Sequence, residues 1–563
     1  MARLSELFLP TLRDAPADAQ ALSHKLMVRA GLVRQLGAGM WSYLPAGWRA
    51  HRRVEAILRE EMDAIGAQEA LLPVLQPADP WRATGRWDIP ELFKLTDRKG
   101  TEYCLAMTHE ETVTWHVAQE VRSYRELPLM LYQLQVKARD EARPRAGVLR
   151  TREFIMKDAY SFDRDTAGME ATYERTIGAY DRIFDRAGVQ WYRVEADVGM
   201  MGGAGAHEYM APCAAGEDEI ALAPGYAANL EVASAVAQPP GGAAEFRARP
   251  DEVSTPGLVT VEQVAGHLGV VPGALLKAVP LVAEGRGLVL CLVRGDHRLN
   301  EIKAATALGG AVRPAGAEEI DDAIGPVGFV GPVGAEVPVV LDLAVDQVHC
   351  YVTGANRPDA HLTGVQPGRD FTFEPADLRS VEPGDETEAG YPIEIIPAIE
   401  IANIFKLGSR YSDALGATYL DENGSENPIV MASYGIGPAR VIAAAIEQMA
   451  DEKGIVWPAG IAPWDVHIVS LGKPGSEEAA ASERLYAELS EEGHEVLLDD
   501  RAAGAGEKFT DAELLGCPVR LTVGRRGLAD GVVEGQRRAD GTTASIALDA
   551  VAAGVEDLAR EPR

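Results

Sequence analysis

The stretch RPRAGVLRTREFIMKDAYSFD, residues 143–163, is the most informative part of this sequence. It gathers basic side chains around apolar, strand-like runs, although the whole chain has a formal net charge of −31. The basic residues are Arg143, Arg145, Arg150, Arg152 and Lys157. Such a cluster is either a salt-bridged surface or a site for an anionic ligand, and the rest of the sequence has to distinguish between these two interpretations.

The composition indicates a soluble globular protein of several domains. The 563 residues suffice for about three or four domains, and 47% hydrophobic with 25% charged residues is ordinary for such proteins. No apolar leader or long apolar run occurs, so we expect a cytoplasmic protein that does not bind a membrane. Five cysteines without a CxxC pair fit a reducing compartment. The acidic total argues against DNA or non-specific nucleic-acid binding, so any RNA contact must come from local patches.

Apolar periodicity predicts three elements in the first and last thirds of the chain. Residues 47–66 form a helix whose apolar face ends at Gly66, and the apolar run after it contains Pro73, which suits an edge strand or an interface. Residues 168–188 form a second helix that ends at a glycine. Residues 428–449 run from a strand through a glycine turn into a helix.

Two further regions differ from the rest of the chain, one in composition and one in its pattern of strands and helices. Residues 236–385 are rich in Gly, Pro, Ala and Val and lie between the linker-like stretches AQPPGGAAE (237–245) and VEPGDETEAG (381–390), which indicates an inserted module. After residue 464 a strand–helix–strand pattern predicts a small α/β unit.

Charged residues around the opening stretch recur at strand spacing. Residues 137–158 read as two strands joined by a charged loop, in which Arg139 and Glu141 share one face. Arg150, Phe154 and Asp158 recur at intervals of four. Guanidinium, carboxylate and aromatic groups on one sheet face can bind phosphate, Mg²⁺ and a base. A cross-strand salt-bridge ladder is the commoner meaning of such a pattern, and charge alone favours it.

The residues of three segments favour the interpretation of the basic cluster as a ligand site. Arg139-Asp-Glu141 with Arg150, Phe154 and Asp158 resembles motif 2 of the class II aminoacyl-tRNA synthetases, and the segment from Ser433 to Arg440, SYGIGPAR, resembles motif 3. The 47–66 helix with Pro73 resembles motif 1, the dimer interface of that class. Each motif alone is weak evidence, but three in order are strong evidence.

Three longer stretches indicate the amino acid that is activated. MTHEET (107–112), the opening stretch and GGAGAHEY (202–209) together resemble the bacterial prolyl-tRNA synthetase family, the form with an editing insertion. The resemblance covers nearly the whole chain. A threonyl-type synthetase is the alternative within the class, and a non-catalytic synthetase paralogue is the alternative outside it. A free-standing editing protein would consist of the insertion alone.

The resemblance implies an α/β (α+β) multidomain fold. It comprises an antiparallel-sheet catalytic core in two parts, residues 1–235 and 386–464, an inserted α+β editing domain, residues 236–385, and a C-terminal α/β anticodon-binding domain, residues 465–563. The implied partners are tRNA(Pro), L-proline and a second copy of the chain in a homodimer. The implied cofactors are ATP and Mg²⁺.

The resemblance also assigns roles to residues of the core. The catalytic residues are Arg139, Glu141 and Arg440. ATP is expected to contact Arg139, Glu141, Arg150, Phe154, Gly435, Gly437 and Arg440, with Glu141 on the metal side. Proline is expected to contact Thr108, Glu110, Arg139 and His207, and the tRNA acceptor end Arg143 and Arg145. Without the resemblance, His207 would read as an ordinary loop histidine.

An editing site has a physical motive. A pocket that fits the proline ring cannot exclude alanine by size, because missing methylenes change binding by only ~1–3 kcal/mol. The family resemblance assigns hydrolysis of mischarged Ala-tRNA to Lys277, Asp342 and His361. Taken singly, Lys277 reads equally well as a solvated lysine and GAN (354–356) as a turn.

The last domain contains a local excess of arginine. Arginine donors suit the two guanines of a prolyl anticodon. The residues are Arg520, Arg525, Arg526, Arg537 and Arg538. Near motif 3 the chain departs from many family members at Ser433 and Asn403, which affects the expected detail of the proline pocket but none of the arginines or glycines.

Overall fold

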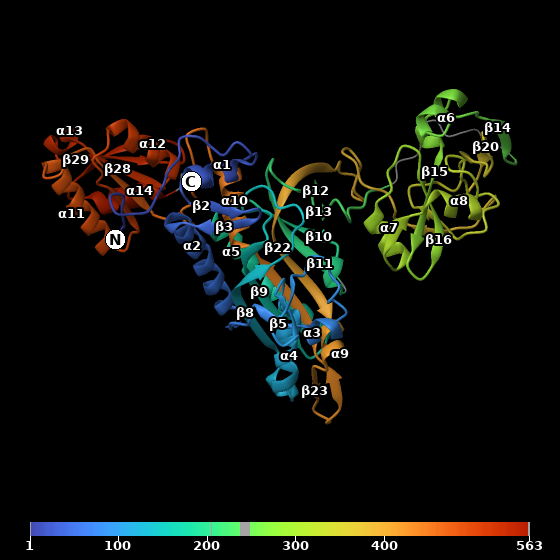
Figure 1. Cartoon of the computed structure of the whole chain (residues 1–563). Coiled ribbons are helices and arrows are strands. Elements are labelled where there is room, and N and C mark those ends of the chain that lie inside the picture. The colour runs from blue at the N-terminus through green and yellow to red at the C-terminus, as the bar shows by residue number, and fades with distance from the viewer. Residues whose placement is uncertain (1, 204, 237–247, 561–563) are drawn as a thin grey trace. The chain divides into compact units, whose positions relative to one another are not determined.

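The computed structural model describes residues 2–203, 205–236 and 248–560 (Figure 1). The chain forms two compact units. The first comprises Met1–Arg193, Val198–Asp218 and Pro397–Arg563, and the second Val194–Asp197 and Glu219–Ile396. The expected linker at 237–245 lies outside the described residues. The functional names given to the domains remain predictions.

A largely antiparallel sheet forms the centre of the first unit. Six of its strands pair in the order β11, β22, β25, β9, β8 and β4, and of these five pairs only β4–β8 is parallel. Their bounds are β4 Gln68–Glu69, β8 Leu129–Ala138, β9 Glu153–Asp163, β11 Gly205–Pro212, β22 Glu394–Gly408 and β25 Val430–Ile436. The expected antiparallel-sheet core is therefore confirmed.

Strand β8 is shorter than the sequence pattern predicts. It ends at Ala138, so Arg139 and Glu141 lie beyond the strand, and the prediction that strand alternation aligns them was wrong. The chain turns there because Asp140 N donates to Glu91 O at 2.8 Å and Glu141 N donates to Arg139 O at 2.7 Å. The next strand, β9, lies where the sequence predicts a strand.

Three helices cover one face of this sheet (Figure 1). They are α2 Pro45–Ala64, α5 Thr166–Ala187 and α10 Pro438–Met449, and α1 Leu22–Arg29 packs on α10. The expected helices are confirmed with their ends shifted by one or two residues. Gly66 and Gly188 take positive φ after their helices, at +84° and +69°, as the sequence predicts. Pro438 occupies the first turn of α10.

Short elements cover the opposite face. A three-stranded sheet in the order β5, β7, β6 lies beside helices α3, α4 and α9. The bounds are β5 Leu75–Pro77, β6 Lys94–Thr96, β7 Glu102–Leu105, α3 Ala78–Ala83, α4 Glu110–Glu120 and α9 Arg410–Leu415. Strand β5 is an edge strand, as predicted, although it begins after Pro73. Helix α4 starts at Glu110, with His109 as its N-cap residue, and so carries Glu110 in its first turn.

The C-terminal residues form the predicted small α/β unit. Its sheet has the order β1, β27, β26, β28, β29, β30, with β1 (Ala2–Arg3) supplied by the N-terminus. The other bounds are β26 Val466–Ser470, α11 Glu477–Glu491, β27 Val496–Asp499, α12 Ala505–Leu515, β28 Val519–Val523, α13 Arg525–Ala529, β29 Val532–Arg537, β30 Thr543–Ala547 and α14 Val551–Ala559.

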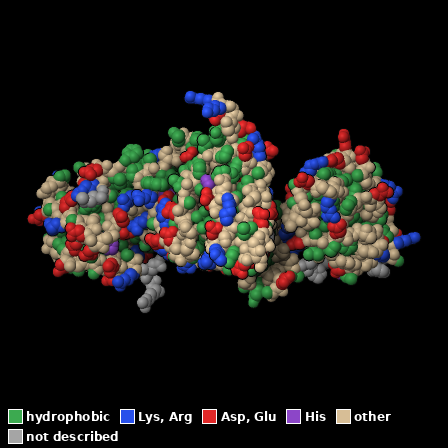
Figure 2. Space-filling model, turned by 90° about the horizontal axis from the view of Figure 1, so that it is seen from below, with side chains coloured by type: hydrophobic (Ala, Val, Ile, Leu, Met, Phe, Trp, Pro, Cys, Tyr) green, Lys and Arg blue, Asp and Glu red, His purple; other side chains and the backbone are tan. Residues whose placement is uncertain are grey.

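Three arginines of this part have acidic partners that the local charge count missed. Arg520 pairs with Glu513 at 2.7 Å, Arg537 with Asp540 at 2.9 Å and Arg538 with Asp451 at 2.7 Å. These arginines therefore stabilise the fold, and the exposed Arg525 and Arg526 are the ones left for an RNA contact. On the face that Figure 2 shows, basic and acidic side chains are interspersed.

The second unit is built on two sheets. One has the order β17, β15, β16, β18, β21, and the other β14, β20, β19. The bounds are β14 Asp251–Ser254, α6 Val261–Leu268, β15 Leu276–Ala283, β16 Gly287–Arg294, α7 Glu301–Leu308, β17 Val312–Pro314, α8 Ala317–Ala323, β18 Val339–Asp342, β19 Tyr351–Gly354, β20 Ala360–Val365 and β21 Glu374–Ala376. It also contains the hairpin β12 Asp218–Ala223 with β13 Tyr226–Asn229, and β10 Tyr192–Ala196 beside β13. Within the described residues, no helix is long and apolar enough to cross a membrane.

Lys157 lies in the core and not in a ligand site. Its side chain is fully buried beneath α5, where Nζ donates to the Tyr180 hydroxyl and, at 3.2 Å, to Tyr434 O. Burial lowers its pKa well below the ordinary value of 10.5, and Asp158 offsets this only in part. Including Lys157 in the anion-binding cluster was therefore wrong.

Replacing Lys157 by methionine should stabilise the first unit by about 1 kcal/mol or more, because a buried ammonium loses its hydration. The parent should also gain stability as pH rises toward 10.5, since the unfolded chain then binds more protons than the folded chain, and Lys157→Met should abolish that gain. Thermal unfolding at several pH values measures both effects, with the exposed Lys99→Met as control. A less stable Lys157→Met protein would contradict the assignment.

Candidate active site

A cavity of about 300 Å³ lies at the ends of β9 and β25 and the start of α10. All seven residues expected around ATP line it. They are Arg139, Glu141, Arg150, Phe154, Gly435, Gly437 and Arg440. The structure thus brings together residues that lie up to 301 positions apart in the sequence (139 to 440).

Arg440 is fixed in position by oxygen atoms from two segments. Its Nη1 contacts the Glu400 carboxylate and the Glu400 carbonyl, each at 2.9 Å, and its Nε donates to Leu149 O at 3.1 Å. The side chain starts from the first turn of α10 and remains partly exposed toward the cavity. An arginine held in this way keeps part of its donor fork available for a bidentate acidic group.

Arg139 also lines this cavity. Its guanidinium lies over the Phe154 ring, 5.1 Å from the centroid, and its Nε donates to Met107 O at 3.4 Å. Burial lowers the pKa of Arg139 first, and the nearby charge of Arg440 lowers it further, whereas Glu400 and Glu110 raise it. Two guanidinium groups therefore act on one another in this cavity, an arrangement that an anion would stabilise.

The loop after β8 contains ion pairs as well as cavity residues. Glu141 Oε2 pairs with Arg150 Nε at 2.9 Å, and this bond is the main reason for its lowered pKa. Arg145 pairs with Glu217 at 2.7 Å, and Arg143 is exposed. The salt-bridge interpretation of the opening stretch is thus correct for part of it. Arg145 lines a second, wider cavity instead, beside Trp41 and His24.

Asn403, one of the two positions where the sequence suggested a departure from the family, contacts Glu400 beside the cavity. It lies opposite Gly435 on the neighbouring strand, and its Nδ2 donates to Glu400 Oε1 at 2.8 Å. A Cβ on Gly435 would stand 2.9 Å from Asn403 Oδ1, so the glycine makes room for this amide. Asn403 therefore orients the carboxylate that holds Arg440. Ser433 is buried on β25 and does not line the cavity.

Thr108 and Glu110 form a direct pair beside Arg139. The Thr108 hydroxyl donates to the Glu110 carboxylate, which is 3% exposed. Below them lies a buried network in which Lys137 Nζ contacts Asp158 Oδ1 at 2.7 Å and His109 Nδ1 at 2.6 Å. Burial lowers the pKa of His109 to about 3, with Lys137 as the second cause, so this imidazole is neutral. The expected proline residues Thr108, Glu110 and Arg139 are thus brought together.

His207 does not belong to this group. It is paired with Ile404 across β11 and β22, and side chains of directly opposed residues lie on the same face of a sheet. That face carries α5, and the Tyr173 hydroxyl of α5 lies 2.8 Å from His207 Nδ1. The expectation that His207 lines the proline pocket was therefore wrong, because the sequence did not reveal which face of β11 is which.

The second unit has a cavity of its own, of about 340 Å³. Lys277 on β15 and His361 on β20 both line it. His361 is buried, with Nδ1 2.7 Å from the Thr255 hydroxyl, and burial lowers its pKa. The segment GAN turns at Asn356, at φ +57°, whose side chain accepts from Gly331 N at 2.7 Å.

Asp342 has a structural position and does not line this cavity. Its carboxylate accepts three backbone N–H groups, from Ala344 at 2.9 Å, Leu378 at 2.7 Å and Arg379 at 2.9 Å. The side chain thereby joins β18 to the segment after β21. The role of Asp342 in hydrolysis therefore stays a prediction, and the structure places its carboxylate on backbone amides.

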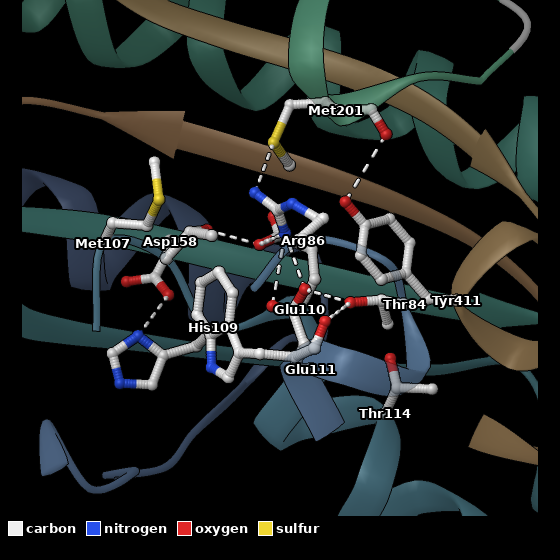
Figure 3. Close-up of polar contacts among 12 residues, drawn as sticks. Thr84, Arg86, Met107, His109, Glu110, Glu111, Thr114, Asp158, Met201 and Tyr411 are labelled. Carbon is white, nitrogen blue, oxygen red and sulfur yellow. Dashed lines mark hydrogen bonds and ion pairs between the residues drawn. The ribbon is translucent and has the colours of Figure 1, made fainter. Parts of the chain in front are cut away.

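Several residues at the core site escaped the sequence reasoning. Glu400 holds Arg440, and Arg86 pairs with Glu111 at 2.9 Å beneath Glu110 (Figure 3). Glu111 lies within the segment MTHEET (107–112), which the sequence analysis singled out, but the sequence does not indicate its pairing with Arg86. Nothing local marks Arg86 or Glu400, whose partners lie 25 and 40 residues away.

The oxygen and nitrogen donors around the cavity bear on metal binding. Among the residues that the structure describes, no three His, Cys, Asp or Glu side chains stand close enough together to hold an ion. The carboxylates of Glu141 and Glu400 face the cavity singly. Such a site suits Mg²⁺ that arrives with phosphate oxygens, since Mg²⁺ is often held by one or two carboxylates plus a nucleotide.

Two family models match the chain. Residues 93–449 match the tRNA synthetase class II core domain (G, H, P, S and T), and residues 465–558 match the anticodon binding domain. The first model alone covers more than half of the sequence. The class II fold is thereby established.

Curated relatives match over their full length. The proline–tRNA ligase of Syntrophotalea carbinolica is 48% identical over 578 aligned positions, covering 99% of each chain. That of Thermodesulfovibrio yellowstonii is 45% identical over 561 positions, covering 97% of each. Among solved structures, prolyl-tRNA synthetase from Cryptosporidium parvum, complexed with L-proline and AMP, has a TM-score of 0.59 at 14% identity, covering 98% of this chain and 78% of that one, and shows a likeness of fold. The chain therefore belongs to the proline–tRNA ligase family of class II tRNA synthetases.

Proposed function

We propose that this proline–tRNA ligase forms prolyl-adenylate in the cavity between β9, β25 and α10. The observation that carries the proposal is the pair of guanidinium groups, Arg139 and Arg440, which line one cavity with Phe154, where burial and then the charge of Arg440 lower the pKa of Arg139. Triphosphate is the ligand that best relieves this repulsion. The Phe154 ring offers a surface for the adenine.

The residues would act by positioning and by charge stabilisation. A carboxylate oxygen of proline attacks the α-phosphorus of ATP, forming one P–O bond as the P–O bond to pyrophosphate breaks. Arg139 is placed to hold both the proline carboxylate and the α-phosphate, where charge develops, and Arg440 to hold the γ-phosphate. Glu400 and Asn403 keep Arg440 in that orientation. No protein nucleophile is needed.

Mg²⁺ is part of the proposal through Glu141. When bound, the ion would neutralise phosphate charge. Glu141 lines the cavity, and its lowered pKa keeps the carboxylate ionised. Its present partner, Arg150, would compete for the same carboxylate or turn to a phosphate oxygen.

The proline ammonium is assigned to Thr108 and Glu110. A secondary ammonium carries one positive charge and two N–H donors, which fit a buried carboxylate and a hydroxyl. Glu110 and Arg139 act electrostatically on one another, so the two ends of a bound amino acid would meet opposite charges. This arrangement favours proline over an uncharged analogue.

The remaining assignments concern tRNA, assembly and compartment. Arg143 and Arg145 in the loop after β8 are proposed to contact the tRNA acceptor end, and the C-terminal α/β part is proposed to contact its anticodon.

A homodimer through α2 and the β5 region is proposed from the family resemblance, and the sedimentation mass of the chain would decide it. A cytoplasmic location agrees with the free cysteines, none of them in a disulfide.

The second candidate activity is hydrolysis of Ala-tRNA in the second unit. It is supported by the cavity that contains Lys277 and His361. Lys277 is exposed at this cavity and could contact an RNA phosphate or the terminal ribose. Because this unit has its own hydrophobic cores, its chemistry should be separable from amino-acid activation.

Arg440→Ala should reduce proline-dependent ATP–pyrophosphate exchange by on the order of 10²-fold or more, because a charge-assisted contact to the transferring phosphate is lost. Circular dichroism should be unchanged. The exposed Arg98→Ala serves as the matched control and should exchange normally. Near-parental exchange by Arg440→Ala would show that another group holds the triphosphate.

Lys277→Ala should leave prolyl-tRNA formation within about twofold of the parent while slowing deacylation of preformed Ala-tRNA by roughly tenfold or more, the usual scale for losing one charge-assisted contact. Lys453→Ala, at an exposed lysine outside the second unit, is the control. Equal deacylation rates for Lys277→Ala, His361→Ala and the parent would exclude this cavity as the hydrolytic site.

A further inference from the structure

Glu110 belongs to a buried cluster of two carboxylates and one guanidinium (Figure 3). Arg86, Glu110 and Glu111 have side-chain exposures of 2%, 3% and 0%. With both glutamates ionised, the cluster carries one more negative than positive charge. Buried charges of this kind are tolerated only when they are paired, so the cluster is incomplete without a further cation.

The cluster distributes its contacts unequally. Arg86 Nη1 lies 2.9 and 3.2 Å from the two carboxylate oxygens of Glu111 but 3.7 Å from Glu110. The Thr84 hydroxyl also donates to Glu111, at 2.9 Å. Glu110 accepts from Thr108 instead. Arg86 therefore compensates Glu111, and the charge of Glu110 is left for a ligand.

The guanidinium has little freedom to change partner. It lies 5.2 Å from the Trp81 ring centroid and 5.5 Å from that of Tyr411, and its Nη2 is 3.5 Å from Met201 Sδ (Figure 3). Two aromatic rings thus fix its position. If the charge of Glu111 were removed, Arg86 would remain where it is and act on Glu110 alone.

We propose that Arg86 and Glu111 are positioning residues that keep Glu110 an uncompensated buried anion, so that the secondary ammonium of the amino acid supplies the missing positive charge. This inference rests on the proposed role of Glu110 in proline binding. Two further cations act on Glu110. Arg139 is assigned to the substrate carboxylate and the α-phosphate, and Lys137 is paired with Asp158 at 2.7 Å. Burial raises the pKa of Glu111 to about 7, so its carboxylate is ionised above that pH.

The test is a charge cycle measured by pyrophosphate exchange at pH 8. Glu111→Gln keeps the shape and an acceptor for Thr84 but leaves Arg86 to neutralise Glu110. The KM for proline should rise about 10- to 100-fold, the scale of one charge-assisted contact, while the KM for ATP stays within about twofold. Adding Arg86→Gln removes the competing charge and should return the KM for proline to within about threefold of the parent.

The rescue distinguishes this role from simple structural support, because a supporting pair would leave the double variant at least as impaired as Glu111→Gln. A double variant without recovery would overturn the proposal. If Glu111→Gln does not fold, the apolar replacement Arg86→Met with Glu111→Leu takes its place, since such replacements of buried pairs are often well tolerated. Parental KM for proline there supports the inference, and a raised KM contradicts it.

Two controls complete the experiment. Glu513→Gln makes the same change at a partly buried, arginine-paired glutamate of the C-terminal part and should leave both KM values unchanged. Glu110→Gln separates this inference from the proposed function. If it leaves the KM for proline unchanged, the ammonium site itself is wrong. If it raises that KM while Glu111→Gln does not, only the role of Arg86 and Glu111 is wrong.

Discussion

A charge that is removed from water has to meet an opposite charge, and this constraint organises the face of the sheet around the cavity. Lys137 with Asp158 and Arg86 with Glu111 are buried pairs of this kind, and Arg440 with Glu400 is a partly buried one. Each joins segments that are distant in sequence, so each also fixes the backbone that carries it. The two groups left without a full partner, Arg139 and Glu110, are the ones that would face substrate.

The antiparallel sheet makes this arrangement possible. Side chains alternate between its two faces, so β9 places Lys157 among apolar residues under α5 while Phe154 lines the cavity on the other face. Helices pack on one face of the sheet, and the residues that line the cavity lie on the other face. Gly435, near the end of β25, leaves room for the Asn403 side chain of the neighbouring strand, since a Cβ there would stand 2.9 Å from Asn403 Oδ1.

The sequence predicted those parts whose residues are neighbours along the chain. The ATP-side residues lie in two short stretches, and the helix ends followed from Gly66, Gly188 and Pro438. It could not predict Arg86 or Glu400, because their partners come from other segments. It also misplaced His207, since nothing local reveals which face of a strand is buried, and it did not predict the backbone amides that Asp342 meets.

The central claim is that a buried, uncompensated carboxylate recognises the charge of the amino acid. Pyrophosphate exchange with proline, compared with its oxygen analogue tetrahydrofuran-2-carboxylate, tests this claim most directly, because the two ligands share ring and carboxylate but differ in the ammonium group. The account predicts exchange with proline and at least about 100-fold weaker exchange with the analogue, since a buried anion would face an uncharged ether oxygen. Comparable exchange with both would contradict it.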